Sequence, residues 1–186
     1  MAKQFAAIGV DHRAFIERQR IFFTASAATT SRVNISPRGT DWLRVLDAVT
    51  VAYLDLTGSG NETAAHARAD GRATIMLCAF DGPPQILRLY GRLEICRPGD
   101  QKFEELYAGP FGAAKPPLGT RQIVCLHVEM VQTSCGFGVP LFSYEGERQS
   151  LDRWAEAKGA EGLDAYRRQK NHTSIDGLPT GLTDVG

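Results

Sequence analysis

The sequence predicts a mainly β protein with helical insertions, folded as a small antiparallel barrel. Three observations predict this fold. About six strand-like runs of similar length follow one another along the chain. They arrive at hairpin-like intervals and lack the regular strand–helix alternation of a parallel sheet. The longest runs alternate between polar and apolar residues, as strands with one buried face do.

The expected elements follow from local patterns. In chain order they are a helix at 11–20, strands at 21–26 and 32–36, one helical turn at 41–46, a strand at 49–56, a helix at 63–70, strands at 73–80 and 85–96, a helix at 100–107, a strand at 122–133 and helical material over 146–171. Asp11 can cap the first helix, and Pro37-Arg38-Gly39 closes the second strand. Residues 49–56 are rich in valine, leucine and tyrosine, which favours a strand.

The second half of the chain carries equally clear signals. Ser59 and Glu62 have the spacing of a capping box before the alanine-rich helix, and Gly71 supplies its stop. The run at 85–96 alternates strictly between two faces. Its apolar face holds Leu87, Leu89, Leu93 and Ile95, and its polar face holds Arg88, Tyr90, Arg92 and Glu94.

Length and composition favour one domain. The chain has 186 residues, of which residues 1–145 are expected to form the barrel and residues 146–186 a helical extension and tail of the same domain. Lys plus Arg and Asp plus Glu number 21 each, so no charge excess points to nucleic acid. No apolar run approaches membrane-spanning length, and the first 20 residues lack the apolar core of a signal peptide. A cytoplasmic protein without a membrane or nucleic-acid partner is therefore expected.

The cysteines and histidines predict no metal site. The four cysteines contain no pair separated by two residues, and the four histidines contain no His-x-x-x-His pair. Cys135 has no base near it in sequence, and His127 in its apolar strand is expected to be a core histidine. Glu94 and Glu129 are lone carboxylates, so no catalytic residue can be named.

Residues 32–39 form the first candidate binding site. As a strand, this run directs Arg32, Asn34 and Ser36 to one face, and Val33 and Ile35 to the core. With Arg38 just beyond, that face is rich in donors and suits a phosphate or another acidic ligand. A merely solvated strand face is the alternative.

Residues 57–63 form the second candidate. A glycine-rich turn that leads into a helix leaves free N–H groups at the positive helix end, where anions bind. The lysine of a Walker loop and the third glycine of a dinucleotide fingerprint are both missing. A purely structural turn with a helix cap is the alternative here.

Taken in order, these segments resemble the pyridoxamine 5′-phosphate oxidase-related family of FMN-binding split barrels. The resemblance runs over residues 15–133 and includes the Gly58-Ser59 turn and the strand that contains Gly91. Residues 134–140 and 174–179 resemble an uncharacterised bacterial branch of that family. The resemblance implies a six-stranded antiparallel split barrel with C-terminal helices.

The resemblance also implies a cofactor and a partner. In this family two subunits form a homodimer, and FMN lies in the cleft between them. The strand at 32–38 would face the flavin and its phosphate, residues 54 and 55 would lie beside the ring, residues 59–63 would take the phosphate, and residue 88 would reach in from the other subunit. The implied cofactor-binding residues are Arg32, Val33, Asn34, Ser36, Arg38, Leu54, Asp55, Ser59, Gly60, Asn61, Glu62, Thr63 and Arg88.

Two departures limit what the resemblance implies. Vitamin B6 oxidases follow Gly-Ser with an Arg-Lys pair, whereas this chain has Gly60-Asn61, so phosphate binding would depend on Arg32, Arg38 and backbone N–H groups. The C-terminal segment that holds the B6 substrate in those enzymes has no match. Oxidation of a B6 vitamer is therefore not expected.

The expected function is that of an FMN-dependent oxidoreductase acting on an unknown small substrate, with hydride passing through flavin N5. A flavin-binding or sensing protein without turnover is the first alternative. Binding of deazaflavin F420 or haem is the second, with His127 and His66 as the first candidates for a haem ligand. A barrel with an empty cleft is the third.

Overall fold

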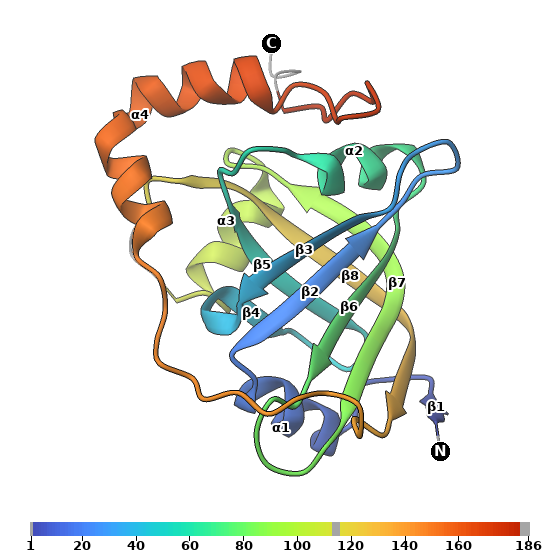
Figure 1. The fold of residues 1–186 in the computed structure, drawn as a ribbon. Helices are drawn as coiled ribbons and strands as arrows, with labels where there is room; N and C mark the ends of the chain where they lie inside the picture. Colours follow the sequence, from blue (N-terminus) through green and yellow to red (C-terminus); the bar gives the residue numbers. More distant parts are fainter. Residues whose placement is uncertain (1, 113–115, 183–186) are drawn as a thin grey trace.

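In the computed structural model, which describes residues 2–112 and 116–182, one antiparallel sheet curls into a split barrel (Figure 1). The strands are β1 (Lys3–Phe5), β2 (Ile21–Ser26), β3 (Asn34–Gly39), β4 (Leu43–Val45), β5 (Thr50–Leu56), β6 (Arg72–Cys78), β7 (Ile86–Cys96) and β8 (Thr120–Ser134). The helices are α1 (Val10–Arg18), α2 (Glu62–Ala69), α3 (Gln101–Ala108) and α4 (Ser150–Lys170). Residue 1 and residues 113–115 of the expected barrel, and residues 183–186 of the expected extension, lie outside the described part.

The expected fold class is confirmed. All six expected strands are present, and two strands of three residues, β1 and β4, are added to them. The helical turn expected at 41–46 was wrong in part, because a 3₁₀ turn at Thr40–Trp42 leads directly into β4. Three residues are too few to show a strand period, so the sequence could not reveal these two strands.

The barrel is open along one seam. The sheet order is β3-β2-β6-β7-β8-β5-β4, with β1 paired to β8, so β3 and β4 lie at the two free edges. Side chains rather than a backbone ladder connect β3 to β5, and the contact between Arg38 and Asp55 is one of these links. This seam is where the candidate binding residues collect.

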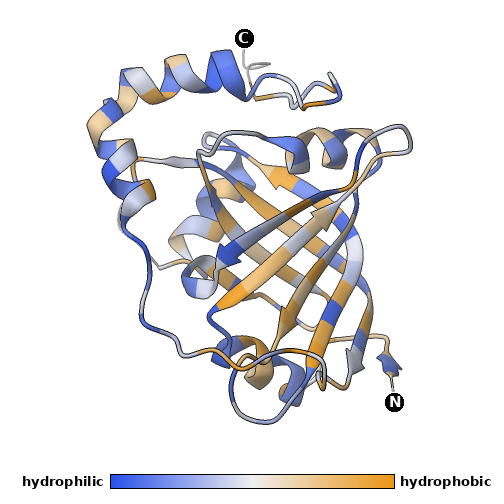
Figure 2. Cartoon of the chain, in the orientation of Figure 1, coloured by the Kyte–Doolittle hydropathy of each residue, from blue (hydrophilic) through white to orange (hydrophobic). Residues whose placement is uncertain are grey.

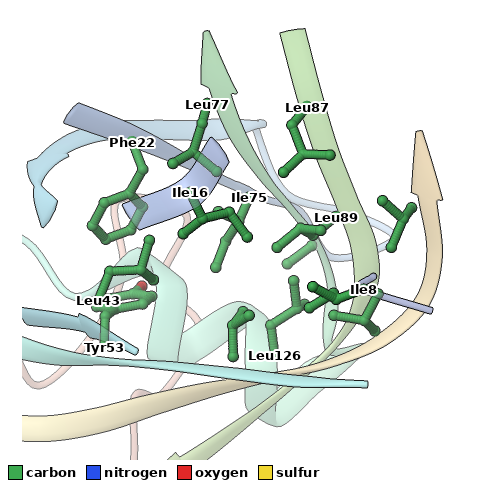
Figure 3. Close-up of a cluster of buried hydrophobic side chains, with 14 of the residues drawn as sticks. Ile8, Ile16, Phe22, Leu43, Tyr53, Ile75, Leu77, Leu87, Leu89 and Leu126 are labelled. Atoms are coloured by element: carbon green, nitrogen blue, oxygen red, sulfur yellow. The ribbon is translucent and has the colours of Figure 1, made fainter. Parts of the chain in front are cut away.

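The core fills the barrel with apolar side chains from nearly every strand (Figure 3). The rings of Phe22 and Tyr53 meet edge to face, with centroids 5.2 Å apart. A second cluster lies between α3 and the outer face of β5 and β8, where Phe103 and Tyr107 pack over Leu54 and Ile123. The middle of both strands is therefore buried on two sides, and Figure 2 shows apolar residues through the barrel wall.

Strand β3 is turned the opposite way from its prediction. The β2 residues opposite its polar residues are buried, and register places Thr24 opposite Ser36 and Ser26 opposite Asn34. The polar residues of β3 therefore share the inward face of β2. Val33 and Ile35, expected in the core, are 68% and 64% exposed. The prediction that Val33 and Ile35 face the core was wrong. The inward face of this edge strand lies beside the polar Thr24 and Ser26 of β2, so its polar residues point inward.

Two glycines have marked effects on the path of the chain. Gly91 of β7 lies opposite a bulge in β8, where a Cβ atom would come within 1.9 Å of the carbonyl oxygen of His127, so only glycine fits. Gly159 has φ +66° and breaks α4 into two parts (Figure 1). The second part of α4 leads into residues 171–182, hereafter the C-terminal segment. No helix within residues 2–112 and 116–182 combines the length and apolar character needed to cross a membrane.

Candidate functional site

A buried carboxylate, Asp55, is the centre of the seam. Its Oδ2 accepts hydrogen bonds from Arg121 Nη2 at 2.7 Å and Nε at 3.0 Å, and from Gln122 Nε2 at 2.8 Å. Its Oδ1 lies 2.6 Å from Arg38 Nη1. Asp55 is 1% exposed, so two guanidinium groups and an amide replace the water that it loses on folding.

Strand geometry explains why these groups meet. Asp55 stands opposite Gln122 in the β5–β8 ladder, and the register then shifts so that Leu56 pairs with Thr120. Arg121 is the extra residue of this bulge and is left without a ladder partner. Both Arg121 and Gln122 can therefore reach the same carboxylate.

The charges of this cluster are locked in place. Burial acts to raise the pKa of Asp55, but the charges of Arg121 and Arg38 and the hydrogen bonds from Arg121 and Gln122 outweigh it, so the pKa lies below its usual range. Burial raises the pKa of Tyr53. The Arg38 guanidinium lies 4.9 Å from the centre of the Tyr53 ring, a cation–π contact. The Asp55 cluster is thus a fixed ionic anchor and not a proton donor.

This anchor fixes the turn before α2. Gln122 Nε2 donates to Asn61 Oδ1 at 2.9 Å, and Arg121 Nη1 donates to the Gly60 carbonyl at 2.9 Å. The capping box expected from Ser59 and Glu62 was wrong, because Asn61 is the N-cap residue and no side chain caps the helix. The N–H groups of Glu62 and Thr63 have no acceptor among the described residues, which suits an anion.

The C-terminal segment lies against the same turn. Asn171 is fully buried, donates to the Gly58 carbonyl at 3.1 Å and accepts from Arg121 at 2.8 Å. Farther along, the Ile175 N–H donates to Glu62 Oε1 at 3.3 Å. Figure 1 shows this segment running beside α2. The chain therefore covers the start of α2 with its own tail.

Arg32 lies at the edge of this region and is not part of β3. Its side chain is 74% exposed and forms an ion pair with the Asp176 carboxylate of the C-terminal segment. The Arg32 N–H donates to the other oxygen of Asp176 at 2.8 Å. Hydrogen bonding from Arg32 lowers the pKa of Asp176, so this carboxylate is charged and holds the arginine.

Other expected residues are divided between the seam and more distant places. Asn34 Nδ2 lies 3.4 Å from Thr63 Oγ1, which joins β3 to α2. Leu54 points away from Asp55 and packs in the α3 cluster. Arg88 lies on β7, where it donates to Ser134 Oγ at 3.2 Å. The site thus brings together the residues of β3, β5 and the 57–63 turn, and Arg88 lies outside it within one chain.

The two histidines named as haem-ligand candidates have different surroundings. His66 on α2 is 1% exposed, its Nδ1 lies 2.9 Å from Ser26 Oγ, and burial lowers its pKa. His66 Nε2 is buried without a partner among the described residues. His127, expected in the core, is instead exposed and forms a 2.7 Å contact with Glu94, because it points to the outer face of β8. No three metal-ligating side chains cluster within the described ranges.

Sequence reasoning missed Arg121, Gln122 and Asn171. One signal was present. Asp55 ends an apolar strand, and a buried carboxylate needs a cationic partner. Arg121, the charged residue just before the expected strand at 122–133, was a candidate for that partner. Asn171 carried no such signal, because its place depends on the path of α4.

Two neighbouring cavities open beside the seam. The smaller, of about 300 Å³, is lined by Arg38, Tyr53 and Trp42 among others. The larger, of about 490 Å³, is lined by Arg20 and Tyr144 among others. Both share Gly39, Glu147 and Arg148, so they adjoin each other. Together they offer room for a small organic molecule next to the polar seam.

The residues at the start of α2 fit a flavin phosphate under one condition. The uncapped helix end and the exposed Arg32 supply donors for an anion. Two carboxylates, Glu62 and Asp176, lie at the same place. A bound phosphate therefore requires Asp176 to release Arg32.

A family model and a known relative both match this sequence. The family model of pyridoxamine 5′-phosphate oxidase matches residues 10–135. The pyridoxamine 5′-phosphate oxidase family protein ustO of Aspergillus flavus is 38% identical over 178 residues, which cover 87% of this chain and 71% of that protein.

Two solved structures share the fold. HupZ of Group A Streptococcus aligns with TM-score 0.52 and 19% identity, over 66% of this chain and 91% of HupZ. A candidate pyridoxamine 5′-phosphate oxidase of Lactobacillus delbrueckii aligns with TM-score 0.52 and 15% identity, over 68% of this chain and 94% of that protein.

Proposed function

Because the chain belongs to the pyridoxamine 5′-phosphate oxidase family, we propose that it binds a flavin, FMN, at the open seam of the barrel and acts as an oxidoreductase. The observation that carries the proposal is the uncapped start of α2 beside the exposed Arg32. When bound, the flavin supplies hydride or electron transfer through N5. The chain supplies binding and orientation.

Each group near the seam has a distinct role in this proposal. Arg32 and the free N–H groups of Glu62 and Thr63 hold the phosphate. The Asp55–Arg121 pair does not touch the phosphate and acts as a positioning element, because Arg121 fixes the Gly60 carbonyl and thereby the turn. The adjoining cavities at Arg38 and Arg20 leave space for a substrate beside the ring.

The proposal includes a homodimer with the flavin between subunits. Val33 and Ile35 support it, since they are large apolar residues exposed on a free sheet edge next to the site. In a dimer a partner subunit covers these residues, and Arg88 of each chain is available to the other's flavin. The free cysteines at 78, 96, 125 and 135 suit a cytoplasmic protein.

The substrate proposed is not a B6 vitamer. Gly60 and Asn61 stand where B6 oxidases carry an Arg-Lys pair, and Asn61 is committed to Gln122. Binding of the flavin phosphate thus depends on fewer cations than in those enzymes.

A visible absorption spectrum of the purified protein tests the proposal, followed by chromatography of the cofactor that heat releases. Flavin bands and release of FMN at about one per chain are expected. Reduction of the bound flavin by NADH or NADPH and its reoxidation would then establish turnover, whereas retention without that cycle indicates a binding protein. A Soret band, or a colourless protein that takes up F420 but not FMN, would contradict the cofactor assignment.

A further inference from the structure

Another cavity, of about 330 Å³, is lined in part by the Arg121 side chain. Four arginines line it, and we call it the arginine cavity. They are Arg97 just after β7, Arg121 at the start of β8, and Arg167 and Arg168 in the last turn of α4. One carboxylate, Asp164, belongs to its lining. Three separate segments of the fold thus bring positive charge to the arginine cavity.

Two of these arginines contribute positive charge to the cavity but have few N–H groups free for a ligand. Arg121 is committed to Asp55, Gly60 and Asn171. Arg167 donates to Thr57 Oγ1 at 2.9 Å, to the Thr120 carbonyl and to Asp164. Burial and the nearby charge of Arg121 lower the pKa of Arg167, a sign that the cavity is crowded with positive charge.

The other two arginines have donors to spare. Arg97 uses Nη2 for the Thr180 carbonyl at 2.9 Å, while its Nε is buried without a partner in the described part of the chain. Thr120 Oγ1, on the lining of the same cavity, is also buried and unpartnered there. Arg168 is exposed and makes no hydrogen bond or ion pair with any described residue. Two guanidinium groups and a hydroxyl on the lining of one cavity thus have hydrogen-bonding capacity that the described residues do not use.

We propose that the arginine cavity binds a phosphate or phosphomonoester group, at a position separate from the flavin phosphate. A dianion with four oxygens can accept from donors that converge from several directions, whereas one planar carboxylate is satisfied by a single guanidinium fork. The lining of this cavity includes Arg121 but none of the proposed flavin-phosphate groups at Arg32, Glu62 and Thr63. This site does not depend on the proposed flavin function.

A calorimetric titration of the full chain with inorganic phosphate tests the site. Saturable binding of one phosphate per chain is expected. Arg97→Gln and Arg168→Gln should each weaken it about tenfold, as loss of one charge-assisted hydrogen bond does. Arg153→Gln is the matched control, because Arg153 is an exposed arginine of α4 outside the cavity. Unchanged melting temperatures would show that the variants fold.

Three results would overturn the site. One is the lack of saturable phosphate binding, and another is an equal loss in the Arg153→Gln control. The third is that acetate binds as tightly as phosphate. A further arm uses FMN and riboflavin: if Arg97→Gln and Arg168→Gln weaken the binding of FMN but not that of riboflavin, the cavity belongs to the flavin phosphate and is not separate. A protein that binds phosphate but no flavin would reject the proposed function and leave this site intact.

Discussion

Arg121 and Asp55 form an ion pair in which both side chains are nearly inaccessible, at 3% and 1% exposed, with 2.7 Å between Nη2 and Oδ2. This pair connects β5 to β8 beside the seam, and through the Arg121 bond to the Gly60 carbonyl it fixes the turn that begins α2. The candidate site thus depends on a buried charge pair whose hydrogen bonds are made to other protein groups.

Arg121→Met should destabilise the fold strongly, because it leaves the Asp55 carboxylate buried with Arg38 as its one cationic partner. Breaking a buried pair costs about 3–5 kcal/mol. The control is Arg72→Met, which removes an exposed pair with Asp70 and should cost below about 1 kcal/mol. Urea denaturation of both variants measures the difference. Equal losses would show that Asp55 finds other compensation.

Arg32→Ala should weaken flavin binding about tenfold, because it removes a charged partner of the phosphate. Asp176→Asn should act in the opposite direction and tighten binding, since it frees Arg32 from its carboxylate. Fluorescence titration with FMN measures both. Riboflavin, which lacks the phosphate, is the control ligand and should be insensitive to either change. Flavin affinity that is unchanged in Arg32→Ala would reject Arg32 as a phosphate ligand.

Ile35→Glu should convert a dimer into a monomer, because it places a charge on the exposed apolar edge of β3. The monomer should also lose flavin. Val10→Glu is the matched control, since Val10 is an apolar residue that is 86% exposed on α1, away from this edge. Light scattering after size-exclusion chromatography gives the mass. A dimer that survives Ile35→Glu would place the interface elsewhere.

The sequence was sufficient for the fold because the signals that set it are local. Alternation in the 85–96 run and the β-rich run at 49–56 survive in β7 and β5 with nearly the expected bounds. β1 and β4 were missed because they exist through pairing with β8 and β5. Their three residues carry no period of their own.

The site was predicted only where one segment defines it. The 57–63 turn was named from its local pattern and Asp55 from the family resemblance, and Arg121 and Gln122 connect the two. Arg121 reaches Asp55 through a bulge, and bulges depend on the partner strand. The prediction of which side chains of β3 face inward was wrong for a similar reason. Val33 and Ile35 face outward because β3 is a free edge of the sheet, and the local sequence does not show which strands lie at an edge.

Stability should fall on acidification in a manner that depends on His66. Burial lowers the pKa of this imidazole below its ordinary value of 6.5, although Ser26, Glu62 and Asp176 act to raise it. The unfolded chain therefore binds a proton at a higher pH than the folded chain does. The contribution of neutral His66 to the free energy of unfolding is fully present above pH 6.5 and is lost as the pH falls through the folded pKa.

His66→Gln keeps a hydrogen-bonding group for Ser26 and removes the titration. Urea unfolding between pH 7.5 and about 5 should show a steeper loss for the unmodified chain than for His66→Gln. Parallel curves would show that His66 does not control this range.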